Sequence, residues 1–400
     1  MGRRVVLAVG GGAAAMKAPF VARRLLEAGF EVRALATRRA LAFTTELALA
    51  TVTGHPVATD AAWFSPSGRT LHLELASWAD LLLVAPATAA DLARAAAGLT
   101  EDLLSATIAS GVRRVLWAPA MNPEIWADPA VASNVESLRR RGGHFFAGPT
   151  EGAMAAVGER PGMGRMLEPE ELAARVRHHL SPKDLWHRVV VVTAGPTREY
   201  LDPVRFLSNP SSGKMGYAVA EAARDRGAEV YLVSGPTDLP PPFGVKVLPA
   251  ESAEEMREWV LAQYEEADLV VMAAAVADWR PAERKLEKEP KVGEEKLLRL
   301  VRTPDILAEL GAKKTHQALV GFAMETERGL DRALDKLRRK NLDLICLNHP
   351  TAPETAFGSD DNRLVFVYPS GRTEATRVLP KRVLADMILD RALQFMQDPV

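Results

Sequence analysis

Residues 193–216 read TAGPTREYLDPVRFLSNPSSGKMG, and the chain is organised around them. They follow the apolar run 189–192, which is typical of a buried parallel strand. They lead into residues 217–226, whose apolar positions recur at helical spacing. A strand, a connection and a helix in this order predict a nucleotide-type crossover unit. The connection spans about twenty residues where two to six are usual, and loops of that length tend to be functional.

This connection is rich in groups that bind anions. They are Arg198, Arg205, Asn209, Ser211, Ser212, Gly213 and Lys214. Amides, hydroxyls and cations at the start of a helix form a surface for phosphate, because unpaired N–H groups and the helix dipole point there. The string is neither GxGxxG nor GxxxxGK[ST], so neither common nucleotide motif explains it. A solvated polar loop is the alternative, but it does not account for this density of donors directly after a strand.

Composition narrows the class of protein. The chain has 400 residues, 48% of them apolar and 25% charged, which predicts a globular protein of two or three domains. A net charge of -1 gives no general attraction to nucleic acid or anionic lipid. Cys346 is the only cysteine, so an intrachain disulfide is excluded and the cytoplasm is the expected compartment. Lys17 interrupts any signal peptide, and Asp91 and Arg94 argue against a membrane span at 81–99.

The first half begins like another crossover unit. Residues 4–9 read as a strand, 10–12 as a glycine turn, 13–28 as a helix and 31–36 as a second strand that ends at Thr37. Amides at such a turn could hold a cofactor phosphate. Many crossover folds use these glycines only to make the turn, so the motif by itself leaves both interpretations open.

Two later strands of the first half, 81–84 and 115–118, end in segments suited to ligands. The small-residue loop 85–89 would let a flat ring approach the backbone at the sheet edge where ligands collect. Asn122 follows the other strand and could either bind a ligand or cap a short helix. His72 could handle a proton or a carboxylate, as histidine side chains in general can near neutral pH, although a lone histidine is more often structural.

In the second half, strands are expected at 229–234 and 269–275, with Asp278 just past the second, as a ligand or as a turn cap. The charged tract 282–296 resembles a solvated loop. Lys336 and Lys340 lie one helical turn apart on a predicted helix at 329–340. They could hold a triphosphate or stabilise the helix dipole. An antiparallel hairpin, 363–368 with 373–378, precedes a terminal helix.

These motifs resemble those of a known family. The segment SNPSSGKMG at 208–216 resembles the nucleotide-binding loop of phosphopantothenate-cysteine ligases. The strings VGGGAAAMK at 9–17 and PAMNPEIW at 119–126 resemble the flavin-dependent phosphopantothenoylcysteine decarboxylases found fused to that ligase, with Gly10, Ala13, Met16 and Ile125 as departures. The resemblance covers the whole chain. It implies two three-layer α/β domains: a flavodoxin-like decarboxylase at 1–181, a linker at 182–188, and a Rossmann-like ligase with a C-terminal β-hairpin at 189–400.

The resemblance also implies chemistry and partners. The ligase half would use CTP and Mg²⁺ to convert 4'-phosphopantothenate to an acyl-cytidylate, which cysteine attacks. The decarboxylase half would use FMN to make 4'-phosphopantetheine. Ligase dimers and decarboxylase trimers would give a cytoplasmic homo-oligomer, with neither nucleic acid nor membrane as a partner. CTP against ATP and the metal ligands stay open.

The same resemblance implies which residues form each site. The catalytic residues would be His72, Asn122, Asn209 and Lys285, the last on a lid segment 285–288 where Lys288 is the alternative. The cofactor would lie against Gly11, Gly12, Ala13, Thr37, Ala85, Thr88 and Ala89. Substrate and nucleotide would contact Met121, Arg165, Met166, Arg205, Ser211, Ser212, Gly213, Lys214, Ala273, Ala274, Asp278, Lys288, Pro304, Asp305, Ile306, Phe322, Lys336 and Lys340.

One position departs from the family pattern. Its decarboxylases carry a flap cysteine that donates a proton, whereas residues 155–166, AAVGERPGMGRM, place Val157 there. Valine cannot donate a proton, and Cys346 is expected to be an inert buried thiol. The last reduction could be slow or use Glu159 or water, and we favour such altered activity. Alternatively, the first domain binds flavin without catalysis, or a neighbouring subunit reorganises the site.

Two other functional classes share some of these features. A nicotinamide-dependent oxidoreductase would share the sheet topology, but the chain lacks GxGxxG with its acidic ribose partner at the usual spacing. A non-enzymatic regulator that resembles decarboxylase-derived phosphatase inhibitors would explain the missing thiol but not a complete ligase half.

Overall fold

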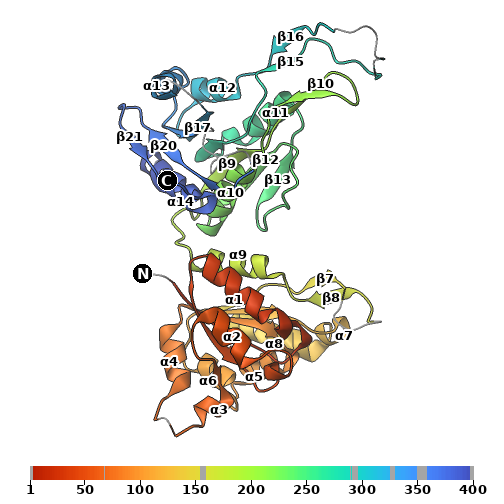
Figure 1. Ribbon diagram of the computed structural model, residues 1–400, viewed down its shortest axis with the longest axis vertical. Coiled ribbons are helices and arrows are strands. Elements are labelled where there is room, and N and C mark those ends of the chain that lie inside the picture. Colours follow the sequence, from red (N-terminus) through yellow and green to blue (C-terminus); the bar gives the residue numbers. More distant parts are fainter. Residues whose placement is uncertain are drawn as a thin grey trace. The chain divides into compact units, whose positions relative to one another are not determined.

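The computed structural model describes residues 3–66, 68–153, 159–288, 290, 296–324, 329–348 and 358–396 (Figure 1). Val157, the position of the expected flap thiol, lies outside the described residues. The chain divides into two compact units, Met1–Ser181 and Pro182–Val400. Each unit is described by itself below. None of the helices in the described ranges combines the length and the apolar character that crossing a bilayer requires.

Across its described residues, the first unit has a six-stranded parallel sheet in the order β3-β2-β1-β4-β5-β6. Its strands are β1 (Arg4–Val9), β2 (Glu31–Ala36), β3 (Ala58–Thr59), β4 (Leu81–Ala87), β5 (Val115–Pro119) and β6 (His144–Phe146). A separate antiparallel pair is formed by β7 (Thr150–Gly152) and β8 (Gly162–Arg165). The strand order reverses between β1 and β4, and open parallel sheets bind ligands at such a switch point.

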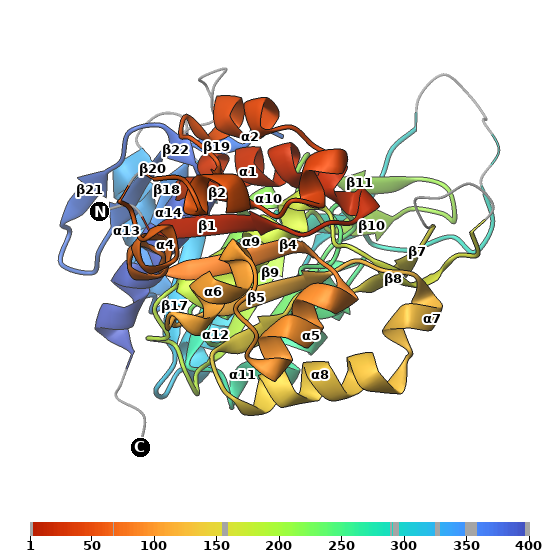
Figure 2. The same cartoon turned by 90° about the horizontal axis from the view of Figure 1, so that it is seen from below.

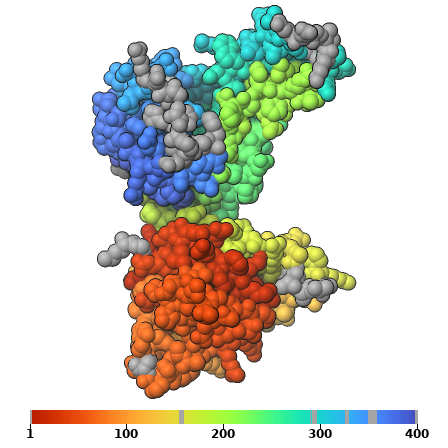
Figure 3. All heavy atoms as spheres, in the orientation of Figure 1, coloured from red at the N-terminus to blue at the C-terminus, as the bar shows by residue number. Residues whose placement is uncertain are grey.

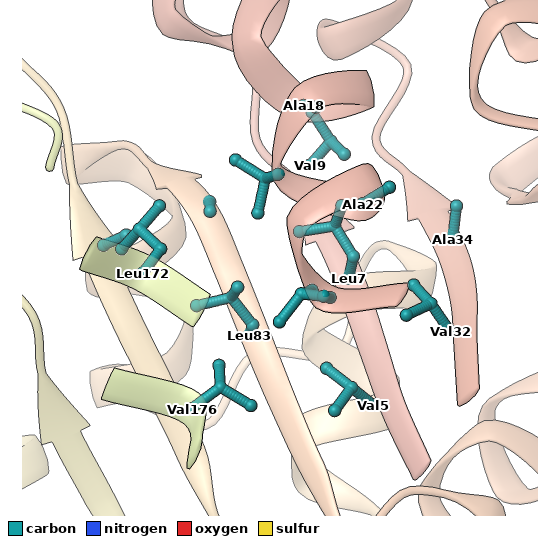
Figure 4. Close-up of a cluster of buried hydrophobic side chains, with 14 of the residues drawn as sticks. Val5, Leu7, Val9, Ala18, Ala22, Val32, Ala34, Leu83, Leu172 and Val176 are labelled. Atoms are coloured by element: carbon teal, nitrogen blue, oxygen red, sulfur yellow. The ribbon is translucent and has the colours of Figure 1, made fainter. Parts of the chain in front are cut away.

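Helices cover both faces of this sheet. They are α1 (Ala18–Glu27), α2 (Glu46–Thr53), α3 (Asp60–Trp63), α4 (Leu71–Trp78), α5 (Ala89–Ala97), α6 (Leu103–Ala109), α7 (Pro123–Trp126), α8 (Pro129–Arg140) and α9 (Pro169–Leu180), with 3-10 turns η1 (Ala13–Lys17) and η2 (Ala40–Ala42). Helices α1, α2 and α9 bury one face, and α4, α5, α6 and α8 bury the other. Figure 4 shows Ala22 of α1 near Leu7 of β1, and Val176 of α9 beside Leu83 of β4.

The second unit, over its described residues, has an eight-stranded sheet in the order β13-β12-β9-β14-β17-β18-β20-β21 (Figures 1 and 2). The strands are β9 (Val189–Ala194), β12 (Glu229–Ser234), β13 (Lys246–Pro249), β14 (Leu269–Met272), β17 (Ala318–Met324), β18 (Leu344–Asn348), β20 (Leu364–Val367) and β21 (Thr373–Ala375). Neighbouring strands from β13 to β18 are parallel, whereas β20 and β21 are antiparallel. The predicted C-terminal hairpin is therefore confirmed, and it extends the main sheet.

Two helical layers enclose this second sheet. Helices α10 (Lys214–Asp225) and α14 (Lys381–Ala392) pack on one face, and α11 (Ala253–Tyr264), α12 (Ile306–Lys313) and α13 (Gly329–Arg339) pack on the other. A 3-10 turn, η4 (Leu393–Phe395), follows α14. Three short antiparallel pairs lie outside the sheet: β10 (Arg198–Tyr200) with β11 (Phe206–Ser208), β15 (Trp279–Pro281) with β16 (Leu300–Arg302), and β19 (Asp361–Asn362) with β22 (Leu379–Pro380). The predicted fold class, two three-layer α/β domains, is confirmed.

Several predicted boundaries were wrong. The long connection contains the β10–β11 pair, whose turn is held because Asp202 Oδ1 accepts the amides of Val204 and Arg205 at 2.8 and 2.9 Å. Helix α10 begins at Lys214 rather than at 217, because Gly213, with φ of 75°, makes the turn just before it. Strand β4 continues to Ala87, beyond its expected end at 84, and β14 ends at Met272 rather than at 275.

The predicted helix 13–28 is divided into η1 and α1. Pro19 lies in the first turn of α1, where a residue without an N–H group is tolerated and marks a new helix start.

Candidate functional site

The second unit has a pocket of about 830 Å³ where its parallel strands end. The structure brings together there most of the residues predicted for the nucleotide and substrate. They are Asn209, Ser211, Ser212, Gly213, Lys214, Ala273, Ala274, Asp278, Pro304, Asp305, Ile306, Phe322, Lys336 and Lys340. A volume of this size suits a bound small molecule.

Polar contacts fix the edge of the sheet that forms the pocket floor. Ala274 donates its amide to Thr193 Oγ1 at 3.1 Å, and Ala277 donates its amide to Thr197 Oγ1 at 3.0 Å. Asn209 Nδ2 donates to the Val276 carbonyl at 3.1 Å. The donor-rich connection is therefore tied to the segment that follows β14, and the two segments line one pocket.

Close packing brings the amino end of α10 to this floor. A Cβ atom on Gly216 would lie 2.6 Å from Ala194 Cβ and 2.7 Å from the Thr193 carbonyl oxygen. Any larger residue would push the helix away from β9. Glycine at this position therefore allows the first amides of α10 and the Lys214 side chain to reach the pocket.

Helix α13 and the residue that follows it supply two cations from the other layer. Lys336 Nζ donates to the Phe322 carbonyl at 2.8 Å, and Lys340 Nζ contacts Asp305 Oδ1 at 2.6 Å. Asp305 Oδ1 also accepts the Ala308 amide at 3.1 Å and so caps α12. Burial opposes ionisation of Asp305, but the hydrogen bonds from Lys340 and Ala308 outweigh it and hold the Asp305 pKa below its usual value. The predicted shared face of the two lysines is present at the pocket.

The first unit has a pocket of about 780 Å³. It includes residues that follow β1 and β4, the strands on either side of the switch point in strand order. The predicted residues that line it are Gly11, Gly12, Ala13, Thr37, Thr88, Ala89, Met121, Asn122, Arg165 and Met166. A Cβ atom on Gly12 would lie 3.7 Å from Thr88 Cγ2 and 4.0 Å from the Ala120 carbonyl oxygen. Since both residues line the pocket, a side chain there would narrow the space between the two strand ends.

Thr88 and Asp91 build the amino end of α5 beside this pocket. Thr88 Oγ1 donates to Asp91 Oδ2 at 2.7 Å, and Asp91 in turn accepts Arg94 Nη2 at 2.6 Å. Asp91 and Arg94 both line the pocket, although the sequence suggested no site role for either. The buried carboxylate holds Arg94 and the capped helix start in fixed positions.

Asn122 makes two different contacts. Its Oδ1 accepts the Glu124 amide at 2.8 Å, so it caps α7, and its Nδ2 donates to Glu159 Oε1 at 2.5 Å. Both Asn122 and Glu159 line the pocket. The capping interpretation is therefore confirmed, and the same side chain also faces the pocket beside a carboxyl group.

The carboxylate of Glu168 bridges two cationic side chains at the pocket of the first unit. Glu168 accepts Lys17 Nζ at 2.9 Å and also contacts Arg165. The hydrogen bond from Lys17 is the main cause that lowers the Glu168 pKa. Both cations line the pocket and are held there by one acidic side chain.

Both halves match known families. The flavoprotein family matches residues 1–181, and the DNA/pantothenate metabolism flavoprotein C-terminal domain matches residues 185–396. The chain is 42% identical over 397 residues to the coenzyme A biosynthesis bifunctional protein CoaBC of Escherichia coli (strain K12). The aligned region covers 97% of this chain and 96% of that protein. The chain belongs to the CoaBC family of bifunctional coenzyme A biosynthesis proteins. This confirms the resemblance and the predicted bifunctional enzyme.

A second relative and one solved structure are also similar to the chain. The chain is 40% identical over 400 residues to CoaBC of Bacillus subtilis (strain 168), with 99% of this chain and 96% of that protein covered. A crystal structure of the C-terminal domain of a CoaBC protein is 41% identical and covers 53% of this chain and 97% of that chain, with a TM-score of 0.46.

Some residues implied by the CoaBC resemblance lie elsewhere. Lys285 Nζ contacts Glu283 Oε2 at 2.8 Å, and neither Lys285 nor Lys288 is among the described residues that line the pocket. Both belong to the β15–β16 arm, defined as the described residues 279–288, 290 and 296–302, which extends together with the β10–β11 pair away from the main sheet (Figure 3). Arg205 lies at the turn between β10 and β11, 3.7 Å from Asp202, and is also outside the described lining.

Two residues of the first unit also depart from the prediction. Ala85 is fully buried inside β4 rather than in a loop, because that strand is longer than expected. His72 lies on α4, where its Nδ1 accepts Trp63 Nε1 at 3.1 Å, and it is outside the described lining of the pocket.

Sequence reasoning missed two cations of the ligase pocket, Arg302 at the end of β16 and Lys381. Lys381, the first residue of α14, lines it and donates to the Ser359 carbonyl. Burial, and then the charge of Lys214, holds the Lys381 pKa below its usual value. Lys381 sits in no local motif. Only the fold, in which α14 packs beside α10, brings it to the site.

Proposed function

We propose that the second unit joins 4'-phosphopantothenate to cysteine with CTP as the consumed nucleotide and Mg²⁺ as its metal ion. Formation of an acyl-cytidylate would release pyrophosphate, and attack by the cysteine amine would release CMP. The observation that supports this proposal most directly is the pocket where Lys336, Lys340 and the amino end of α10 meet. Phosphate oxygens are stabilised by such lysines and helix amides. Ala273 and Ala274 present short side chains, against which a flat base would lie.

The lysines would act by stabilising charge that develops at the transferred phosphorus. Lys336 and Lys340 are already held by Phe322 and Asp305, so little rearrangement would be needed. Asn209, tied to the Val276 carbonyl, would position the reacting carboxylate and phosphate. Mg²⁺ that arrives with a nucleotide usually takes one or two carboxylates beside phosphate oxygens, and Asp278 in the lining would supply one.

We further propose that the β15–β16 arm closes over the bound nucleotide and delivers Lys285, or Lys288 in its place. Lys285 exchanges its contact with Glu283 for the phosphates on closure. A mobile lysine suits a reaction in which charge is needed only after both substrates bind and water must then be excluded.

For the first unit we propose FMN as the cofactor and phosphopantothenoylcysteine as the substrate. The absence of a side chain at Gly12, between Thr88 and Ala120, and the polar amino end of α5 suit a flat ring with a phosphate. FMN, when bound, supplies the redox chemistry that allows decarboxylation. Asn122 would bind the substrate carboxylate. Glu159, 2.5 Å from Asn122, would donate the proton that Val157 cannot, which gives an altered decarboxylase.

His72 would then act on a neighbouring subunit, since it lies outside the described pocket lining of its own chain. As the family resemblance implies, the enzyme would be a cytoplasmic homo-oligomer of ligase dimers and decarboxylase trimers. The proposed domains are 1–181 and 189–400, joined by a linker at 182–188.

One assay tests both halves. Purified enzyme is incubated with 4'-phosphopantothenate, cysteine and either CTP or ATP, while pyrophosphate is measured and product masses are recorded. We expect pyrophosphate release with CTP and formation of phosphopantothenoylcysteine and then of 4'-phosphopantetheine. Absence of pyrophosphate release with either nucleotide would refute the ligase proposal. Accumulation of phosphopantothenoylcysteine in flavin-loaded enzyme would indicate a non-catalytic first unit, and accumulation of an ene-thiol would refute Glu159 as an efficient donor.

A further inference from the structure

The lysines of the ligase pocket come in two pairs from opposite faces of the sheet. Lys336 and Lys340 belong to α13 and the residue that follows it, in the layer with α11 and α12. Lys214 and Lys381 are the first residues of α10 and α14, which form the other layer. All four line the same pocket. The pocket therefore has cations at two separate walls.

The second pair converges on one short segment, residues 358–360. Lys214 Nζ donates to the Gly358 carbonyl at 2.7 Å and to Asp360 Oδ1 at 2.6 Å, while Lys381 donates to the Ser359 carbonyl. Asp360 is 89% exposed, so it is a weakly held partner for a lysine that is 32% exposed. The Asp360 pKa is lowered first by Lys214 and also by the charge of Lys381. One carboxylate thus lies in the field of both lysines.

The proposed ligation brings two phosphate-bearing molecules together. A nucleotide triphosphate and a phosphorylated acid repel one another in a shared pocket unless each has its own cations. Lys336 and Lys340 would bind one of these two anions. The lysines at the start of α10 and α14, with an exposed carboxylate between them, have the charge needed for the other.

We infer that Lys214 and Lys381 form a second anion subsite, which holds the phosphate of 4'-phosphopantothenate after that phosphate displaces Asp360. The nucleotide phosphates then belong to Lys336 and Lys340. The inference rests on the proposed ligase function and assigns the acid substrate a place within the same pocket. Asp360 acts as an internal competitor that occupies the subsite when substrate is absent.

Steady-state kinetics of the full chain test this with Lys381→Gln, Asp360→Asn and Lys246→Gln. Lys381→Gln should raise the KM for 4'-phosphopantothenate about tenfold or more, as expected for a lost charge-assisted hydrogen bond, and leave the KM for CTP within about twofold. Asp360→Asn should lower the KM for 4'-phosphopantothenate, because the competing charge is gone. Lys246→Gln, an exposed lysine paired with Glu229 outside the pocket lining, should change neither KM.

The outcomes distinguish a failure of the proposed ligase function from a failure of the proposed subsite at Lys214 and Lys381. Calorimetric titration of 4'-phosphopantothenate into each variant, without nucleotide, measures the subsite independently of turnover. Wild-type enzyme that binds the acid through Lys381 but releases no pyrophosphate would refute the ligase function and support the subsite. Active wild-type enzyme would overturn the subsite if Lys381→Gln left acid binding unchanged or mainly raised the KM for CTP. An Asp360→Asn variant that bound the acid no better than wild type would overturn the role of Asp360 as a competitor.

Discussion

Asp225 is expected to be the most sensitive polar residue of the second unit. It is fully buried at the end of α10, where its Oδ1 accepts Arg224 Nε and Nη2 at 3.0 and 2.6 Å and its Oδ2 accepts Arg382 Nη2 at 3.0 Å. Asp225→Ala would leave two poorly solvated guanidinium groups without this carboxylate. Removal of one partner from a buried ion pair costs about 3–5 kcal/mol of folding free energy. For a unit of this size, the melting temperature should fall by roughly 6–20 °C.

The assay must report on the second unit alone. CTP-dependent pyrophosphate release, measured after brief heating at increasing temperatures, gives a transition for the ligase half, and calorimetry of the full chain gives a second measure. Glu229→Gln is the matched control, because it breaks an exposed contact with Lys246 and should leave the transition almost unchanged. The reasoning fails if Asp225→Ala shifts the transition no more than Glu229→Gln does.

Three further predictions concern the arm, a pH dependence and the flap. Lys285→Gln should slow CTP-dependent pyrophosphate release roughly a hundredfold, which corresponds to about 3 kcal/mol of transition-state stabilisation, and unchanged turnover would remove Lys285 from the mechanism. Hydrogen bonds from Arg257 and then Lys313 lower the Glu309 pKa to about 2. Since the folded pKa is lowered, this carboxylate stabilises the fold above its unfolded pKa, roughly 4.3, and the contribution is lost as the pH falls toward 2. Glu309→Gln should therefore flatten the decline in stability over that range, as measured by urea unfolding at each pH; an unaltered pH profile would contradict this. Glu159→Gln should slow formation of 4'-phosphopantetheine more than release of carbon dioxide, and equal slowing of both would argue against Glu159 as the proton donor.

Local sequence patterns were sufficient to predict the main strands and helices of both units. The runs that became β1, β2, β9 and β12 are mostly buried, and the strands lie where the sequence predicts them, except that β9 continues two residues past the apolar run 189–192 to Ala194. The spacing of Lys336 and Lys340 placed both on one face of a helix, and the structure brings both to the pocket. Features set by neighbouring residues in the chain could therefore be read from the sequence.

Features set by distant contacts could not be predicted. The β10–β11 pair forms inside the long connection partly because Glu199, nearly fully buried, accepts the amide of Ala253 at the start of α11. Lys381 reaches the pocket only because the antiparallel strands β20 and β21 return the chain to α10. His72 was placed by family resemblance, and the sequence carried no information on which pocket its side chain would face.

The position of Lys381 is coupled to the buried charge at Asp225. Lys381 and Arg382 are consecutive at the start of α14, and Arg382 contacts Asp225 while Lys381 lines the pocket. If Arg382 lost its partner, the first turn of α14 would lose an anchor to α10, on which Lys214 is also carried. Asp225→Ala should therefore raise the KM for 4'-phosphopantothenate even well below its melting transition, whereas the KM for CTP, set by the opposite layer, should change less. An equal rise in both constants would mean that the variant disturbs the whole pocket rather than the wall formed by α10 and α14.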